Sequence, residues 1–466
     1  MLKKYLLGTA MVAAMMGGAG VAHAGTAEAL LKRLHDKGIL SDDDYNDLMR
    51  EQQAENAKAA QAPAPAPAMA DAGGGGAIVR ATPTGIGLVV GPATIKFSGS
   101  VNGFYVHDSA ATPSATTAVA GGIASVGNNS SAVRNGLLPG FLKVDATTTQ
   151  NGWDVGAHFG MYPGINSAAW GALGANNGGQ PTALATAGID FRETFLTVAR
   201  KGYGELKIGR AIGLFGSDAI LNDITLLSSG APGGNVAPSN TTLGRIGSGY
   251  IYTDFQPQIT YTTPTIGGLQ ASVGVFQPLS SLSTGAQANG APQFQARIAW
   301  DGKFNPVALH LWMSGITQEH TLVTTGQKYT GQGLDFGGKA TAGPIAITGY
   351  YYTAKGLGTT VLNLLDTDAS GNTRSSEGYY IQATATYKKF TLGASYGASF
   401  LDYANAADAL ANPTLVRKNS STVGQIRYGL TSWMTLIGEY INSNAKAHNG
   451  NNASSDAVAV GGILFF

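Results

Sequence analysis

The chain lacks cysteine altogether and carries few charged residues. The absence of cysteine excludes disulfide frameworks, thiolate metal sites and cysteine nucleophiles. Charged residues make up 12% of the chain, about half the share that soluble domains usually have. A soluble protein of this length needs a charged surface, which this composition does not supply. With 29 Lys and Arg against 28 Asp and Glu, the chain also lacks the basic surplus that nucleic-acid binding requires.

Long apolar runs are missing after the N-terminus. Lys3 and Lys4 precede an apolar stretch from Tyr5 to Val21, and the triplet Ala22-His23-Ala24 follows it directly. This order predicts a secretory signal peptide over residues 1–24. No later run reaches the roughly 18 apolar residues that a membrane-spanning helix needs. The sequence therefore predicts an exported protein, and any membrane-spanning segments must be strands.

The segment after the signal peptide has helical spacing. Leu30, Leu31 and Leu34 fall on one helical face, and Ser41 is placed to cap a second helix. We expect a short helical segment over residues 25–61, either a self-associating coiled coil or a charged tether. Residues 62–93 are rich in Ala, Pro and Gly and predict a linker.

From Thr94 onward the hydrophobic pattern changes from helical spacing to an alternation of apolar and polar residues. In one clear example, Phe390 and Leu392 share one strand face, whereas Thr391 and Gly393 share the other. Sixteen such segments follow one another, at about 94–108, 141–149, 153–161, 191–200, 204–213, 258–263, 269–276, 293–300, 305–316, 332–341, 345–353, 378–387, 390–400, 421–429, 433–443 and 456–466.

The connections between these segments alternate between two classes. The predicted tight turns are Gln150-Asn151-Gly152, Lys201-Gly202-Tyr203, Asp301-Gly302-Lys303, Ala342-Gly343-Pro344 and Lys388-Lys389. The other connections are long, from about a dozen residues upward. Strict alternation with an even strand count predicts an all-β fold: a 16-stranded antiparallel transmembrane β-barrel over residues 94–466, with a short N-terminal helical segment. Such a barrel encloses an aqueous channel.

The end of the chain indicates the orientation. Phe466 closes the last strand and is expected at the aromatic girdle of the periplasmic rim. With an even strand count, the first strand starts at the same rim. We therefore expect the N-terminal helical segment in the periplasm and the long loops outside.

Two stretches resemble the trimeric porins of Gram-negative outer membranes. Residues 204–216 (GELKIGRAIGLFG) resemble the fifth porin strand running into the third loop, and residues 245–276 resemble the return from that loop and the next hairpin. The resemblance implies a homotrimer in outer-membrane lipid, with a third loop that narrows the channel opposite a ladder of arginines. It places Arg210 in this ladder, and Asp218 and Asp223 on the loop.

The chain departs from that resemblance in two places. The segment 25–93 precedes the first strand, which is more similar to porins with a periplasmic coiled coil, including the phosphate-selective and DcaP-like groups. The third loop carries Gly230-Ala231-Pro232-Gly233-Gly234 in place of the acidic tip that is usual in the family.

The long segment between Gly213 and Gln258 needs a role of its own, because loops of this length are usually functional or disordered. It either folds inward and narrows the channel or lies outside as a mobile loop.

The charges on the inward-facing side of the strands are Lys96, Lys143, Asp145, Asp154, Arg297, Asp335, Lys339, Lys388, Arg427 and Glu439. Six are basic and four acidic, which predicts a mild anion preference. Arg210 shares parity with Leu206 and Ile208, so either a bulge at Gly209 turns it inward or it sits at the lip.

These patterns predict a porin for passive diffusion of small hydrophilic solutes and ions. The histidines form no metalloprotease or nucleophile signature, and His310 and Ser314 lie about 13 Å apart along one strand. We therefore expect no catalytic residue, cofactor or metal. A substrate-specific channel for an anion or small organic solute is the alternative, in which Tyr350, Tyr351, Tyr352 and Trp312 would offer stacking surfaces unless the tyrosines belong to the aromatic girdle. A barrel that anchors the envelope is a further alternative.

Overall fold

The computed structural model describes residues 79–82, 85–166, 189–232, 241–284 and 287–466. The expected signal peptide and helical segment lie outside the described residues. The described end of the range 62–93 contains two short strands, β1 (Val79–Ala81) and β2 (Ile86–Val90), that pair with each other. β2 also pairs with the first barrel strand, so the structured part of the chain begins before Thr94.

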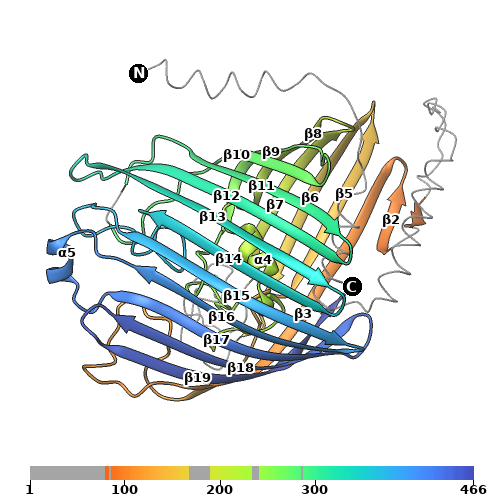
Figure 1. Ribbon diagram of the computed structural model, residues 1–466. Coiled ribbons are helices and arrows are strands. Elements are labelled where there is room, and N and C mark those ends of the chain that lie inside the picture. The colour runs from red at the N-terminus through yellow and green to blue at the C-terminus, as the bar shows by residue number, and fades with distance from the viewer. Residues whose placement is uncertain (1–78, 83–84, 167–188, 233–240, 285–286) are drawn as a thin grey trace.

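In the described part of the chain, sixteen strands form one closed antiparallel barrel, as predicted (Figure 1). They are β3 (Ala93–Ser109), β5 (Phe141–Gln150), β6 (Trp153–Pro163), β7 (Ile189–Arg200), β8 (Gly204–Ile212), β9 (Phe255–Thr262), β10 (Leu269–Phe276), β11 (Gln293–Phe304), β12 (Val307–Thr321), β13 (Lys328–Ala342), β14 (Ile345–Lys355), β15 (Ser375–Tyr387), β16 (Phe390–Leu401), β17 (Val416–Gly429), β18 (Met434–Ala447) and β19 (Asn452–Phe465). Strand β19 pairs with β3 and closes the ring. The short strand β4 (Ser130–Arg134) pairs with β3 beyond the ring.

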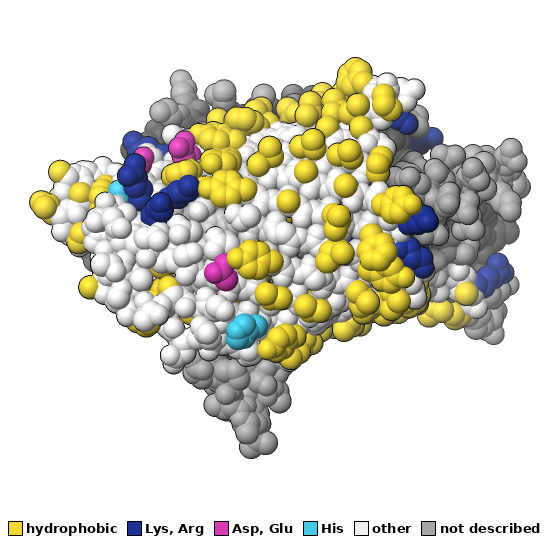
Figure 2. All heavy atoms as spheres, turned by 60° about the horizontal axis from the view of Figure 1, so that its bottom comes forward, with side chains coloured by type: hydrophobic (Ala, Val, Ile, Leu, Met, Phe, Trp, Pro, Cys, Tyr) yellow, Lys and Arg dark blue, Asp and Glu magenta, His cyan; other side chains and the backbone are white. Residues whose placement is uncertain are grey.

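The alternation of each strand separates an apolar outer face from a polar inner face. In β16, Phe390 is 47% exposed and Leu392 57%, whereas Thr391 and Ser395 are buried. Hydrophobic side chains are spread over the outer surface between the two ends of the barrel (Figure 2). An apolar band of this kind is the surface that lipid requires.

Four of the five predicted tight turns join the strands as expected, and one is wrong. Asn151 and Gly152 both have positive φ, of 52° and 77°, as a two-residue hairpin turn between twisted strands requires. Asp301-Gly302-Lys303 is not a turn but part of β11, and the chain reverses at Asn305-Pro306. The Trp300 ring lies against Gly302, where any side chain would collide with it. This contact explains why a glycine stands within the strand.

At the other end of the barrel, two connections are shorter than predicted. The segments 322–327 and 448–451 are tight because their flanking strands continue past the predicted ends. These extensions carry polar residues on both faces, such as Gln318 and Glu319, so the alternation fades before the strand does. The longer loop between β16 and β17 holds a short helix, α5 (Ala406–Ala411). None of the helices in the described ranges is long and apolar enough to cross a membrane.

The C-terminal residue is built into the barrel seam. Phe466 exchanges two backbone hydrogen bonds of 3.0 Å with Gly99 of β3. Its ring lies against Gly99, where a side chain would collide with it. Trp433 lies next to this ring, with centroids 6.3 Å apart. The last residue therefore forms part of an aromatic group at the short-turn end.

Candidate functional site: the lumen and the loop that crosses it

The loop between β8 and β9 lies inside the barrel. It starts with Leu214 and Phe215, whose amides donate to the Gln295 side chain of β11. Gly216 has a φ of 75° and donates its amide to Asp335 of β13 at 2.7 Å. The loop then forms two short helices within the lumen, α4 (Ser217–Asn222) and η2 (Ile224–Leu227) (Figure 1). The outward alternative for this loop is thereby excluded.

Asp218, in the first turn of α4, fastens the loop to β11 and β12. Arg297 donates to both of its carboxylate oxygens, and His310 Nε2 lies 3.3 Å from Oδ1. His310 also contacts Asp301 through Nδ1, at 2.9 Å. Burial alone would raise the pKa of Asp218, but the hydrogen bonds from Arg297 and His310 hold this pKa below its ordinary value. Asp218 is only 2% exposed, so its charge interacts with the strands that hold the loop and not with the open lumen.

Asp223 caps η2 and also binds residues of the later part of the same loop. Its side chain accepts from the Thr225 amide at 2.9 Å and from the Tyr250 hydroxyl at 2.8 Å. The Arg245 guanidinium lies 4.0 Å away, and both charged side chains are fully buried. Burial and the neighbouring Asp223 raise the pKa of Tyr250 well above its ordinary value, so the hydroxyl stays protonated and donates.

The second helix of the loop is held by the wall formed by β15, β17 and β18. Gln382 accepts from the Ile224 amide at 2.9 Å, and Arg427 donates to the Ile224 carbonyl. Glu439 accepts from the Gly230 amide at 2.8 Å. Side chains of the wall thus satisfy backbone groups of the loop, as buried polar groups require.

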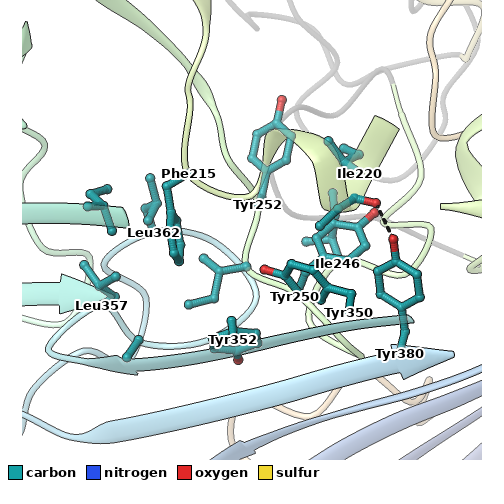
Figure 3. Close-up of a cluster of buried hydrophobic side chains, with 14 of the residues drawn as sticks. Phe215, Ile220, Ile246, Tyr250, Tyr252, Tyr350, Tyr352, Leu357, Leu362 and Tyr380 are labelled. Atoms are coloured by element: carbon teal, nitrogen blue, oxygen red, sulfur yellow. Dashed lines mark hydrogen bonds between the residues drawn. The ribbon is translucent and has the colours of Figure 1, made fainter. Parts of the chain in front are cut away.

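Aromatic side chains fill the space between this loop and the wall (Figure 3). Tyr250 lies edge-on to Tyr350 and Tyr380, with ring centroids 6.5 and 6.1 Å apart. Tyr352 and Trp312 belong to the same buried cluster. The placement of Tyr350 and Tyr352 in the membrane-facing girdle is therefore wrong, because both point inward. Their burial behind the loop also leaves them no open surface on which a solute could stack.

The wall formed by β5–β8 keeps its inward charges partly open. Lys143 pairs with Glu193 at 2.5 Å, and their side chains are 34% and 14% exposed. Asp145 contacts His158 at 2.5 Å, with exposures of 35% and 20%. Inward charges of both signs therefore remain accessible on this wall.

The comparisons with known proteins agree with this architecture. A family model described as Gram-negative porin matches residues 57–462. The chain belongs to the Gram-negative porin family. It is an outer-membrane channel for passive diffusion, and porins are channels rather than enzymes. No curated protein sequence matches the chain.

Several solved structures share the fold of this porin. The outer-membrane channel DcaP of Acinetobacter baumannii has a TM-score of 0.61 and 16% identity, over 80% of this chain and 97% of that one. An anion-selective porin from Comamonas acidovorans has a TM-score of 0.54 and 15% identity, over 80% and 100% of the two chains. OmpF of Salmonella typhi, in complex with daunomycin, has a TM-score of 0.50 and 11% identity, over 80% and 98%. At these identities the likeness concerns the fold.

The remaining predicted residues of this porin lie on the wall, beside η2 and in a short turn. Lys96 is exposed and lies opposite Asp145 in the register of β3 and β5. Lys339 and Arg427 line a cavity beside η2, whereas Lys388 lies in the turn before β16. Asp154, in β6, accepts from Thr149.

Arg210 lies apart from all of these groups. The pairing of β8 with both neighbours continues without a break at Gly209, so no bulge turns Arg210 inward. It keeps the parity of the exposed Leu206 and Ile208, and its guanidinium donates to the Phe255 carbonyl at the strand end. Arg210 therefore sits at the lip.

Sequence reasoning missed several residues that hold the loop. His310, Tyr250 and Arg245 bind Asp218 or lie beside Asp223, and nothing in their sequence neighbourhood indicates it. A usable signal exists in the inward glutamines of the wall, since an amide both donates and accepts and so suits irregular backbone. These are Gln293, Gln295, Gln318, Gln382 and Gln425. In the described residues, no cluster of three or more His, Cys, Asp or Glu could hold a metal ion.

Proposed function

We propose that solutes cross this porin between the β5–β8 wall and the inner loop 213–254. The observation that carries the proposal is the difference in exposure. Lys143 and Asp145 stay about one third exposed, whereas Asp218 and Glu439 are at most 5% exposed. Lys96 and Lys143 then line the path. The loop narrows it from the opposite side and presents the partly exposed Leu226.

In this proposal, most of the other predicted charges position the loop and do not meet the solute. Asp218 with Arg297, Asp223, and Glu439 with Arg427 all contact or support the loop backbone. Lys339 lines the cavity beside η2. Arg210, at the lip, acts on ions only as they enter.

We also propose that ion selectivity is weak. The expected anion preference counted neither β7 nor β8, whose inward charges include Glu193, Glu205, Asp190, Arg192 and Lys207. Along the proposed path these five join Lys96, Lys143, Asp145 and Asp154, so that four bases stand against five acids. The fields of neighbouring opposite charges largely cancel at distances greater than their separation, and salt screens what remains beyond the Debye length of about 8–10 Å.

The assembly and orientation follow the porin pattern in our proposal. The protein forms a homotrimer in the outer membrane, is exported through the signal peptide 1–24, and holds residues 25–61 in the periplasm. Crosslinking of the purified protein should then yield trimers, and single-channel insertions should occur in threes. Conductance steps that are always single would contradict the trimer.

The experiment for the path is single-channel recording of the full chain and of a variant without residues 218–230. If the loop narrows the path, the deletion should raise conductance by roughly twofold or more. Reversal potentials under a salt gradient should show little ion preference in the full chain. Circular dichroism checks that the deleted barrel still folds. An unchanged conductance in a folded variant would overturn the proposal, and block of the full chain by one solute class would favour the substrate-specific alternative.

A further inference from the structure

Two glycines interrupt the inward face of β6, on the wall along which we propose that solutes pass. The inward positions of this strand are Asp154, Gly156, His158, Gly160 and Tyr162, so a ring follows each glycine two positions later. Glycine weakens the interior of a strand because it offers no side chain to pack. Each of the two glycines therefore needs a local reason, and the neighbouring rings supply it.

The imidazole of His158 lies over Gly156. A Cβ atom at position 156 would lie 2.6 Å from Nε2 of His158 and 2.8 Å from Oγ1 of Thr197, closer than real Cβ atoms approach other atoms. Nε2 lies 3.0 Å from the Thr197 hydroxyl, and Nδ1 lies 2.5 Å from Asp145. Only 20% of the His158 side chain is exposed. The ring is therefore folded flat along the wall, in the space that a side chain at position 156 would fill.

Neighbouring side chains bound this imidazole along the wall. The Phe195 ring of β7 stacks on it, with centroids 4.6 Å apart and an interplanar angle of 17°. Further along β6, the Tyr162 ring fills the space over Gly160, where an added Cβ would lie 2.8 Å from its Cε2 atom. A hydrogen bond from the Tyr162 hydroxyl to Glu193 holds that ring in place. The space that remains for an imidazole displaced from Gly156 is the lumen.

His158 stands at the level of the inner loop. Gln382, which accepts from the Ile224 amide of η2, and His158 lie at similar sequence distances from the short turns at Lys388 and Asn151. Because all strands of a barrel tilt alike, similar distances from the short turns correspond to similar heights. A ring that left the wall here would enter the path where the loop already narrows it.

We propose that Gly156 sets the width of the channel on this side, because it lets the His158 ring fold back onto the wall. The inference rests on the proposed path along β5–β8 and adds a residue that determines which solutes fit through it. A side chain at position 156 turns the imidazole into the lumen and lowers the size limit for passing solutes. Gly156 is thus a positioning residue, which acts on solutes through His158.

The test is single-channel recording of the full chain and of Gly156→Ala. Its methyl group takes the place of the ring, and we expect the conductance to fall about 1.5- to 2-fold. Polyethylene glycols of graded size, added as probes, should be excluded at a smaller size by this variant. The double variant Gly156→Ala, His158→Ala lacks the displaced ring and should conduct like His158→Ala.

The matched control is Gly424→Ala, on the exposed face of β17. An added Cβ there meets no atom of the described residues within 4 Å, so neither the conductance nor the size limit should change. Circular dichroism verifies that each variant is folded.

Two results would overturn this inference. One is an unchanged conductance in folded Gly156→Ala although removal of residues 218–230 raises it, since the loop proposal then stands and this one fails. The other is a loss that persists in the double variant, because the imidazole is then not its cause. If the loop deletion itself has no effect, the path proposal fails, and this inference fails with it.

His158→Ala tests the same geometry if Gly156→Ala does not fold. A ring that lies flat on the wall takes little of the lumen, so its removal should raise the conductance by less than about 1.2-fold. A larger rise would mean that the ring already projects into the path, which contradicts the inference.

Discussion

Two walls of this barrel have the same strand pattern but different inner surfaces. On β14–β19 nearly every inward residue is buried, including Thr348, Gln382 and Ser443. On β5–β8 the inward residues Lys143, Asp145 and His158 keep contact with the lumen. The strands do not cause the difference, because both walls alternate in the same way. It arises from the loop between β8 and β9, which covers one wall and leaves the other open, and from residues 121–125, which bind inward Asn419 and Ser455 at the long-loop end.

Apolar residues of β18 and of the neighbouring β3 pack against the loop from the inside of the barrel. Phe104 and Ile441 point inward and pack in one cluster with Leu227 of the loop. In an empty aqueous channel these side chains would face water, which is unfavourable by about 1.5–3 kcal/mol for each. Their presence shows that the wall and the loop form one packed unit. The barrel therefore combines a protein core and a polar channel within a single ring of strands.

The largest effect on this comparison should come from removing one carboxylate of the inner loop and one of the open wall. Asp218→Ala leaves the mostly buried Arg297 without this carboxylate and should lower the free energy of unfolding by about 3–5 kcal/mol. Asp145→Ala, on the open wall, should cost about 0–1 kcal/mol because its pair with His158 is partly hydrated. Urea unfolding in detergent measures both. Equal losses would mean that the ion pair that holds the loop is no better packed than the pair on the open wall.

The second prediction concerns the pH dependence of the Asp218 ion pair that holds the loop. Because the pKa of Asp218 is lower in the folded protein than its ordinary 3.8, its ion pair contributes stability above that value. This contribution is lost as the pH falls below 3.8 toward the lowered pKa. The difference in unfolding free energy between the unmodified chain and Asp218→Asn should thus shrink as the pH falls below about 4. A difference that grows on acidification would contradict this.

The smallest effect is expected from neutral substitutions on the open wall, and it concerns ions. Lys143→Gln should shift the reversal potential toward cations, and Asp145→Asn should shift it toward anions. Each should change the permeability ratio by roughly twofold in dilute salt and less in concentrated salt. Shifts of the same sign in both wall variants would show that these residues act through structure.

The sequence predicted the barrel well because its strands are governed by local alternation. Phe390 and Thr391 occupy opposite faces whatever the rest of the chain does, and the same holds along the other strands. One turn prediction was wrong because glycine occurs both in tight turns and within strands beside a large side chain. Gly302 resembled a turn glycine but makes room for the Trp300 ring. The inward loop was beyond local reasoning, because Asp218 meets Arg297 and His310 from distant strands. Parity alone also could not reveal which inward charges the loop would cover.

The seam between the last strand and β3 has a consequence for biogenesis. Phe465 pairs with Ser100, and Phe466 bonds to Gly99, so the final residues complete the sheet with its first strand. Until they have been made, both margins of the growing sheet carry unsatisfied backbone groups that lipid cannot solvate. Contacts between such distant parts of a chain form slowly, and exposed strand edges invite aggregation. Insertion into the bilayer therefore has to wait until β19 has been made, and loss of residues 464–466 would remove the pairing with β3 at the short-turn end of the seam.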